Sequence, residues 1–274
     1  MRKKGILWLL AVIITLAAAI YQRSTGPTYS KEITFTLEGN EYKESLPRSS
    51  SGSDSCQVVM DIPASVEARL YYKRYPTNEN WSVQPFRKKD NKQVAALPPQ
   101  PPAGKLQYFI EIQTKNKRIY LARSKPLIIR YKGEVSTGVL IPHIILMFAA
   151  MLFSTLAGLF ALAKKEQYRL YGWITLVLLI LGGFIFGPIM QYQAFGDAWT
   201  GIPFGWDLTD NKTLVAIAGW VTAVISNRKK YRPRDYVIAA ILLLVIYSIP
   251  HSLMGSEYDY SKGEVTTGLI QWMP

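Results

Sequence analysis

Two histidines are the residues of this sequence best suited to chemistry, because imidazole ligates metals and haem iron and carries protons near neutral pH. His143 and His251 are its only histidines, and each directly follows a proline. Each falls in a long apolar segment, where a polar side chain is costly and normally has a partner. Two interpretations stay open. The pair holds a haem b or a metal ion, or each imidazole bonds a backbone carbonyl freed by a helix irregularity.

The predicted depths of these two histidines in a membrane agree. His143 lies five residues inside the outer end of its apolar segment, about 7–8 Å along a helix. His251 lies sixteen residues from the inner end of its own segment, about 6 Å below the outer face of a core about 30 Å thick. A metal site at this level could include Glu257 or Asp259, which follow His251.

A second candidate site is the loop 191–212, which is rich in aromatic residues and glycine. Trp199 and Trp206 are suited to the headgroup level of a membrane, as part of an aromatic belt. Asp207 and Asp210 have the spacing of an N-cap and the N3 position of a helix that starts near residue 208. A cation site built from these carboxylates is the alternative.

The elements that must position these residues are apolar segments of membrane-spanning length. The N-terminal segment 1–21 has a basic start and an apolar run, and indicates an uncleaved anchor, with a removable signal peptide as the alternative. In the second segment, Ala150, Ser154 and Gly158 form a small-residue face for close helix packing. Pro250 should kink the last turn of the fifth. The four spans after the anchor are predicted at 138–163, 172–191, 208–226 and 236–254.

The distribution of charge predicts the topology. Lys and Arg concentrate at the N-terminus and in the loops 164–169 and 228–235, and short loops rich in these residues stay in the cytoplasm. We therefore expect the chain to lie in a cytoplasmic (inner) membrane with its N-terminus on the cytoplasmic side. Residues 28–133 and the tail 255–274 are then on the outer side. The net charge of +13 is thus mainly a topology signal, so we expect the lipid bilayer and no nucleic acid as a partner.

Residues 28–133 predict a soluble all-β domain. Short stretches alternate between apolar and polar residues, as in 33–37. The segments 106–112 and 119–122 flank a polar loop and predict a hairpin. The proline-rich stretch 97–104 is typical of an extended connector. Cys56 is the only cysteine, so the domain must be held by its core and not by an internal disulfide.

The part of this domain from Cys56 to Lys132, with LPPQPPAGKLQYFIEI at its centre, resembles the immunoglobulin-like or fibronectin type III sandwich. The resemblance lies in the rhythm of the strands and in the proline-glycine lead into a strand that bears a tyrosine. It implies a module that binds or spaces other molecules rather than one that catalyses, although fold alone does not assign function.

A short internal similarity links two predicted membrane borders. KGEVSTGVLI at residues 132–141 recurs as KGEVTTGLI at residues 262–270. Both segments fall on the predicted outer side, so we expect them to form matching docking segments there.

The fold class predicted from the sequence is a membrane α-helical bundle of five spans, the N-terminal anchor included, with an inserted extracytoplasmic β-sandwich. No P-loop, nucleophile-elbow, CxxC or HExxH pattern is present. We therefore expect a non-catalytic binding, assembly or sensing component of an envelope complex, with a protein partner in the envelope. The alternative is a membrane redox or ion-handling protein in which His143 and His251 bind a haem b or a metal near the outer face.

Overall fold

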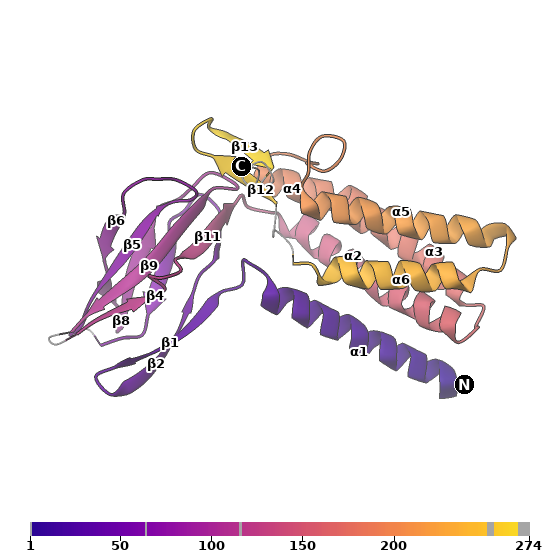
Figure 1. Cartoon of the computed structure of the whole chain (residues 1–274), viewed down its shortest axis with the longest axis horizontal. Coiled ribbons are helices and arrows are strands. Elements are labelled where there is room, and N and C mark those ends of the chain that lie inside the picture. The colour runs from indigo at the N-terminus through magenta and orange to yellow at the C-terminus, as the bar shows by residue number, and fades with distance from the viewer. Residues whose placement is uncertain (1, 64, 115–116, 251–254, 268–274) are drawn as a thin grey trace. The chain divides into compact units, whose positions relative to one another are not determined.

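The computed structural model describes residues 2–63, 65–114, 117–250 and 255–267. The chain divides into two compact units (Figure 1). A helical unit contains the chain up to Pro27 and from Val135 to Ser256. A β unit contains Thr28–Glu134 together with Glu257–Thr266. The predicted domain 28–133 therefore gains a segment from the C-terminal tail.

The larger sheet of the β unit is built around β9 (Lys105–Gln113). β9 pairs along one edge with β5 (Glu67–Arg74), and β5 pairs with β6 (Ser82–Pro85). Along its other edge, two strands pair with different halves of β9. These are β11 (Leu127–Lys132) and β10 (Arg118–Leu121), and the parallel partner of β11 is β3 (Ser49–Ser51).

The predicted hairpin in this sheet is confirmed by the pairing of β9 with β10. Its loop is closed by Thr114, whose hydroxyl accepts from the backbone N–H of Lys117 at 3.0 Å. Leu106, Tyr108 and Ile110 alternate along β9 and point into the core, where each is almost fully buried. This is the period-two pattern by which a strand with a buried face is recognised.

A smaller sheet contributes the second layer of the same core. β4 (Cys56–Met60) pairs with β8 (Lys92–Leu97), which pairs with β7 (Arg87–Lys89). Val58 and Met60 of β4 pack in one cluster with Leu70 and Ile110 of the larger sheet. The β unit thus holds several sheets around one core, in the manner of a β-sandwich.

A hairpin of β1 (Lys31–Leu37) and β2 (Asn40–Leu46) adds to this core. Its two-residue turn is Glu38-Gly39, and both residues have positive φ, at 51° and 87°. Such a turn matches the right-handed twist of the strands. Phe35 and Leu46 reach the sandwich core, and Phe35 stacks on Tyr42 with ring centroids 5.8 Å apart.

A further hairpin ends the described residues, and its segment Glu257–Thr266 belongs to the β unit. It consists of β12 (Ser256–Asp259) and β13 (Glu264–Thr267). The similarity between residues 132–141 and 262–270 therefore has no structural counterpart within the described residues. The first copy begins at the last residue of β11 and enters a helix at Thr137, whereas the second starts in a turn and continues as β13. Trp272 and the rest of the tail lie outside the described residues.

The helical unit contains the predicted apolar segments as helices. Three of them are long and apolar enough to cross a membrane: Lys4–Thr25, Thr137–Leu162 and Tyr168–Phe195. By length and composition these three support membrane crossing, and the five-span architecture stays a prediction. The helices are α1 (Arg2–Thr25), α2 (Thr137–Leu162), α3 (Tyr168–Leu179), α4 (Gly187–Phe195), α5 (Leu208–Lys229) and α6 (Pro233–Ser248).

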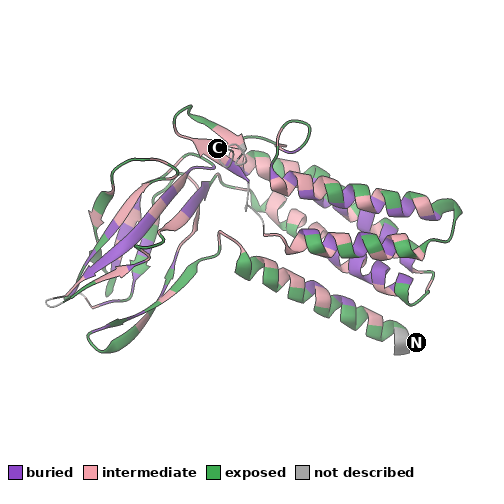
Figure 2. Cartoon of the chain, viewed as in Figure 1, coloured by how far each residue is buried: buried purple, intermediate pink, exposed green. Residues whose placement is uncertain are grey.

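Close packing in this unit follows the small residues of α2. Ala150, Ser154 and Gly158 are all buried, and a Cβ placed on Gly158 would lie 2.7 Å from the Cβ of Ala240 in α6. The predicted small-residue face is thus confirmed as a helix contact. Figure 2 shows α1 mostly in the colours of exposed and half-buried residues. Its exposed apolar side chains include Ile6, Leu9, Ile13, Leu16 and Ile20.

Two helix ends differ from the predictions. The span predicted at 172–191 is part of a longer rod, in which a π-helical segment (Ile180–Phe186) joins α3 to α4. The span predicted at 236–254 ends as a helix at Ser248, so Pro250 does not kink a last turn within it. A proline disfavours helical geometry in the residue before it, and Ile249 is accordingly extended with φ −74° and ψ 118°. His251 lies outside the described residues.

Candidate functional site

The imidazole of His143 is bonded to a neighbouring helical rod. His143 lies in the second turn of α2, and its Nδ1 is 2.9 Å from the carbonyl oxygen of Gly182. A carbonyl oxygen can only accept, so Nδ1 carries the proton and donates. In the neutral ring the other nitrogen, Nε2, is then an acceptor. This agrees with the interpretation that the imidazole bonds a backbone carbonyl, although that carbonyl belongs to a different helix.

The π-helical segment explains why the Gly182 carbonyl is positioned for this bond. Pro188 lacks an N–H and its ring excludes the carbonyl four residues earlier, so the preceding turn widens. The N–H of Gly187 reaches back five residues to the Gly182 carbonyl. That oxygen therefore accepts one bond from its own rod and one from His143. A π-bulge of this kind often marks a functional position.

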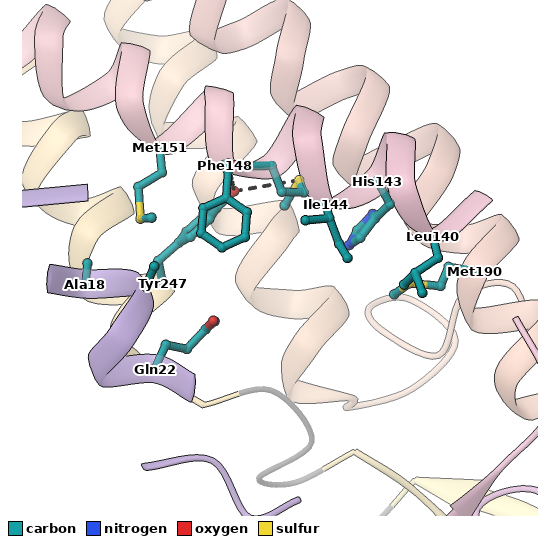
Figure 3. A pocket seen from close by; sticks show the side chains of 11 residues that line it. Ala18, Gln22, Leu140, His143, Ile144, Phe148, Met151, Met190 and Tyr247 are labelled. Atoms are coloured by element: carbon teal, nitrogen blue, oxygen red, sulfur yellow. Dashed lines mark hydrogen bonds between the residues drawn. The ribbon is translucent and has the colours of Figure 1, made fainter. Parts of the chain in front are cut away.

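A cavity opens beside His143 at the end of the helical unit formed by the C-terminus of α1 and the N-terminus of α2. Its volume is about 230 Å³. Figure 3 shows the imidazole among apolar side chains, with Gln22 extending from α1 toward them. The lining comes from α1 (Ala18, Ala19 and Gln22), α2 (Leu140, His143, Ile144, Met147, Phe148 and Met151), α4 (Met190) and α6 (Tyr247).

Tyr247 forms one wall of this cavity and also borders a second, smaller one. Its hydroxyl donates to the carbonyl oxygen of Met147 at 3.2 Å. The hydroxyl also lies 3.6 Å from the Met147 sulfur, and Figure 3 draws this contact. The smaller cavity has a volume of about 20 Å³ and is lined in part by Met147, Tyr247 and Lys212. A space of that size holds about one water molecule.

Lys212 is a buried charged residue that the sequence interpretation missed. It lies in the first turns of α5 with 7% of its surface exposed, and its Nζ donates to the carbonyl oxygen of Ile249 at 2.9 Å. The carbonyls in the last turn of a helix lack intrahelical partners, so Lys212 satisfies one just beyond the end of α6. The sequence signal was a lysine at the outer end of a predicted span, where the positive-inside rule does not expect one.

Asp207 forms the N-cap of α5, as predicted. Its Oδ1 accepts from the N–H of Thr209 at 2.7 Å, and its Oδ2 accepts from the N–H of Ser256 at 3.0 Å. The carboxylate therefore joins the start of α5 to the chain that follows α6. Because both oxygens already accept from backbone N–H groups, this geometry is that of a structural cap.

Asp210 holds the loop before α5 rather than completing a capping box. Its Oδ2 accepts from the backbone N–H of Thr200 at 2.6 Å, from that of Gly201 at 3.1 Å and from the Gln191 amide at 3.1 Å. The N–H of Asp207, which a capping box would bond to the N3 side chain, donates to the Thr200 carbonyl at 3.0 Å. Asp210 thus fixes the loop 196–207 to the helix.

The two tryptophans of this loop have different environments. The indole N–H of Trp199 donates to the Ile202 carbonyl at 3.1 Å, and its ring meets Phe184 edge-to-face at 5.4 Å. Trp206 is 62% exposed and its neighbour Phe204 is 83% exposed. Large exposed aromatic rings beside apolar helices are typical of the headgroup level of a membrane.

Glu257 and Asp259 have partners within the β unit. Glu257 forms an ion pair with Lys105, and both side chains are more than four-fifths buried. Burial lowers the pKa of the Lys105 ammonium group, and Glu257 partly opposes that shift. Asp259 accepts from the N–H of Ser261 at 2.9 Å and from its hydroxyl at 2.6 Å, and these bonds lower the pKa of the carboxyl. Both carboxylates belong to the β unit, whereas His143 belongs to the helical unit.

Tyr260 fixes the C-terminal hairpin to the proline-rich stretch at residues 97–104. Its hydroxyl accepts from the backbone N–H of Lys105 at 3.0 Å and donates to the Gln100 side chain at 2.9 Å. The Arg74 guanidinium lies 5.2 Å from the ring centroid, and burial raises the pKa of the Tyr260 phenol to about 12. A Cβ on Gly104 would lie 3.0 Å from the Tyr260 hydroxyl, so only glycine leaves this room.

Metal ligands do not gather in the described part of the chain: residues 2–63, 65–114, 117–250 and 255–267 contain no group of three His, Cys, Asp or Glu side chains that could hold an ion. The proposed haem or metal pair cannot be placed, because His251 is outside these residues. Comparisons with known protein families, with curated proteins and with solved structures found no match for this chain.

Proposed function

We propose that this chain is a five-span protein of a cytoplasmic membrane, with its N-terminus inside and the β unit outside. Three described helices support membrane crossing by length and composition. The basic residues in the loops after α2 and α5 support the orientation. Trp220 of α5 and Leu243 of α6 are buried in one core with Leu156 of α2. If α2 crosses the bilayer, α5 and α6 therefore lie in the bilayer with it.

The strand order supports an immunoglobulin-like assignment for the β unit. In their order within the sheet, β4, β8 and β7 correspond to strands B, E and D of such a domain. In the other sheet, β5, β9 and the strands at the second edge of β9 correspond to C, F and G. Domains of this architecture commonly serve as binding modules, and that use is the one proposed here.

The proposed function is a non-catalytic binding, assembly or sensing component of an envelope complex. The observation that carries it is the connectivity of the two units. The chain passes between them after Pro27, Glu134, Ser256 and Thr266. The third passage leads into the hairpin fixed by Glu257 and Tyr260. A β unit that the chain joins to the helical unit at several positions suits a component that conveys a binding event to the membrane.

Photo-crosslinking in living cells tests this function on the full chain. A photoreactive residue replaces Val83 on β6 or Val59 on β4, which are 48% and 38% exposed. The control replaces Ile238 on α6, which is 65% exposed. We expect a discrete adduct with one envelope protein from a β-unit position and none from Ile238. If neither Val83 nor Val59 gives an adduct, the proposal is contradicted.

The redox or ion-handling alternative is favoured by one observation. The bond from His143 Nδ1 to the Gly182 carbonyl leaves Nε2 as the basic nitrogen, and metal-ligating histidines commonly have this arrangement. A haem b between His143 and His251 would give the detergent-purified protein a Soret band that is lost in His143→Ala and His251→Ala. A colourless, metal-free preparation would remove this alternative.

A further inference from the structure

We infer that the cavity beside His143 binds a lipid whose head presents a hydroxyl group, with that hydroxyl donating to His143 Nε2. This inference goes beyond the proposed function, because it concerns the helical unit and not the partner of the β unit. It rests on the helical unit lying in a membrane, as proposed above.

The polarity of the ligand follows from the tautomer of His143. The Nδ1–H group donates to the carbonyl oxygen of Gly182, which lies 2.9 Å from Nδ1. Nε2 therefore offers a lone pair. No bond to Nε2 exists within the described part of the chain. A ligand that donates a hydrogen bond therefore satisfies the ring. A carbonyl or ether oxygen cannot donate, and a carboxylate would place a charge in an apolar space at high cost.

The walls of the cavity select an apolar body. Apart from Gln22, His143 and the Tyr247 phenol, its lining is aliphatic, aromatic or thioether. The Tyr247 hydroxyl is already engaged with the Met147 carbonyl.

The space exists because α1 contributes small side chains to it. Ala18 and Ala19 line the cavity where larger residues would fill it. Ile144 and Phe148 line the opposite wall and are 42% and 44% exposed, so the cavity is accessible from the side of the helices. An opening on that side admits a molecule from the hydrocarbon layer without passage through water.

Several membrane lipids share this chemistry, namely an apolar tail with a hydroxyl donor. Diacylglycerols, polyprenols and reduced quinones are the sources to be distinguished. A fatty alcohol with a photoreactive diazirine in its chain serves as the probe for the shared chemistry. Dioctanoylglycerol, a short prenol and a hydroquinone, each added as competitor to the full-length protein in detergent, identify the preferred source.

The first measurement is photolabelling by the fatty-alcohol probe, with the labelled peptides mapped. We expect labels on the lining segments of α1, α2 or α6, and competition by dodecanol. Dodecyl methyl ether, which cannot donate, should compete about 3–10-fold less well, the worth of one hydrogen bond. Equal competition by the alcohol and the ether would overturn the inference.

Two variants of His143 separate its two nitrogens. His143→Asn can keep the donor to Gly182 but removes the acceptor at the Nε2 position, and should weaken dodecanol competition about 3–10-fold. His143→Gln can place an acceptor near the Nε2 position and should stay within about twofold of the natural protein. If the asparagine variant binds as well as the glutamine variant, Nε2 does not hold the ligand.

A cavity-filling pair on α1 tests the location. Ala18→Leu should abolish labelling, whereas Ala17→Leu should not, because Ala17 is exposed and does not line the cavity. Unchanged labelling of Ala18→Leu, or a haem Soret band that depends on His143, would overturn the inference. Cysteine labelling of the loops, made on the same preparations in cells, separates a wrong topology from a wrong ligand.

Discussion

The hydroxyl oxygen of Tyr260 lies 3.0 Å from the backbone nitrogen of Lys105, a residue 155 positions earlier in the chain. This bond, together with the ion pair between Lys105 and Glu257, makes the C-terminal hairpin a part of the β unit. The last helix of the helical unit is therefore followed by a segment that is folded against the sandwich rather than by a free tail.

Removal of this hydroxyl should loosen the hairpin. Tyr260→Phe leaves the Lys105 N–H and the Gln100 amide oxygen without this partner, at an expected cost of about 1–2 kcal/mol. The measurement is the rate of proteolysis within residues 255–267 under native conditions, which should rise about 5–30-fold. Tyr258→Phe is the matched control, because its hydroxyl makes no hydrogen bond within the described residues. Equal rates for the two variants would refute the role of Tyr260.

The stability of the hairpin should fall at high pH. Burial raises the Tyr260 pKa from 10.0 to about 12, so between these values the folded form binds the proton more tightly than the unfolded form. The free energy of unfolding therefore decreases as pH rises through this window, and the contribution is fully present below pH 10. The difference between natural protein and Tyr260→Phe, measured by the same proteolysis with an alkali-tolerant protease, should shrink from pH 9 to pH 12. A constant difference would contradict this linkage.

Loss of the Asp210 charge should release the loop 196–207. The Asp210 carboxylate accepts from two backbone N–H groups and from the Gln191 amide. In Asp210→Asn a neutral amide oxygen accepts these bonds less strongly, which should destabilise the loop by about 2–3 kcal/mol. Cleavage of the loop by an added protease should become readily detectable. Asp197→Asn in the same loop is the control, since Asp197 is exposed. Resistance of the Asp210 variant equal to that of the control would show that the loop is held by other contacts.

Replacement of Lys212 should destabilise the junction after α6. Lys212→Met keeps the length of the side chain but leaves the Ile249 carbonyl unpaired, which should cost about 1–3 kcal/mol. Thermal unfolding of the detergent-purified protein is the measurement, with Lys229→Met as an exposed control. A higher melting temperature for Lys212→Met would contradict this, because it would mean that desolvation of the ammonium group destabilises the fold more than its hydrogen bond stabilises it.

Local patterns predicted much of the fold. The span expected at 138–163 is the helix Thr137–Leu162, and the hairpin around residue 114 forms as expected. The small face of α2 packs as its four-residue spacing indicates. Each of these depends on residues close together in the chain, so periodicity and turn chemistry suffice to find them.

The parts that were missed depend on contacts between distant residues. The docking of Glu257 and Tyr260 on Lys105 joins segments more than 150 positions apart, and the partner of His143 lies in another helix. Lys212 is buried because its ammonium group bonds a carbonyl just beyond the end of α6. The position of that end depends on how strongly Pro250 terminates the helix. Periodicity within one segment carries no information on such pairings.

Topology is the most direct test of the account. In full-length protein with Cys56→Ser, a single cysteine is introduced at Lys229, after α5, or at Lys262, in the C-terminal hairpin. A membrane-impermeant thiol reagent applied to intact cells should label Lys262→Cys at once and Lys229→Cys only after the cells are opened. Labelling of both positions under the same condition would place the two loops in one compartment and contradict the five-span orientation.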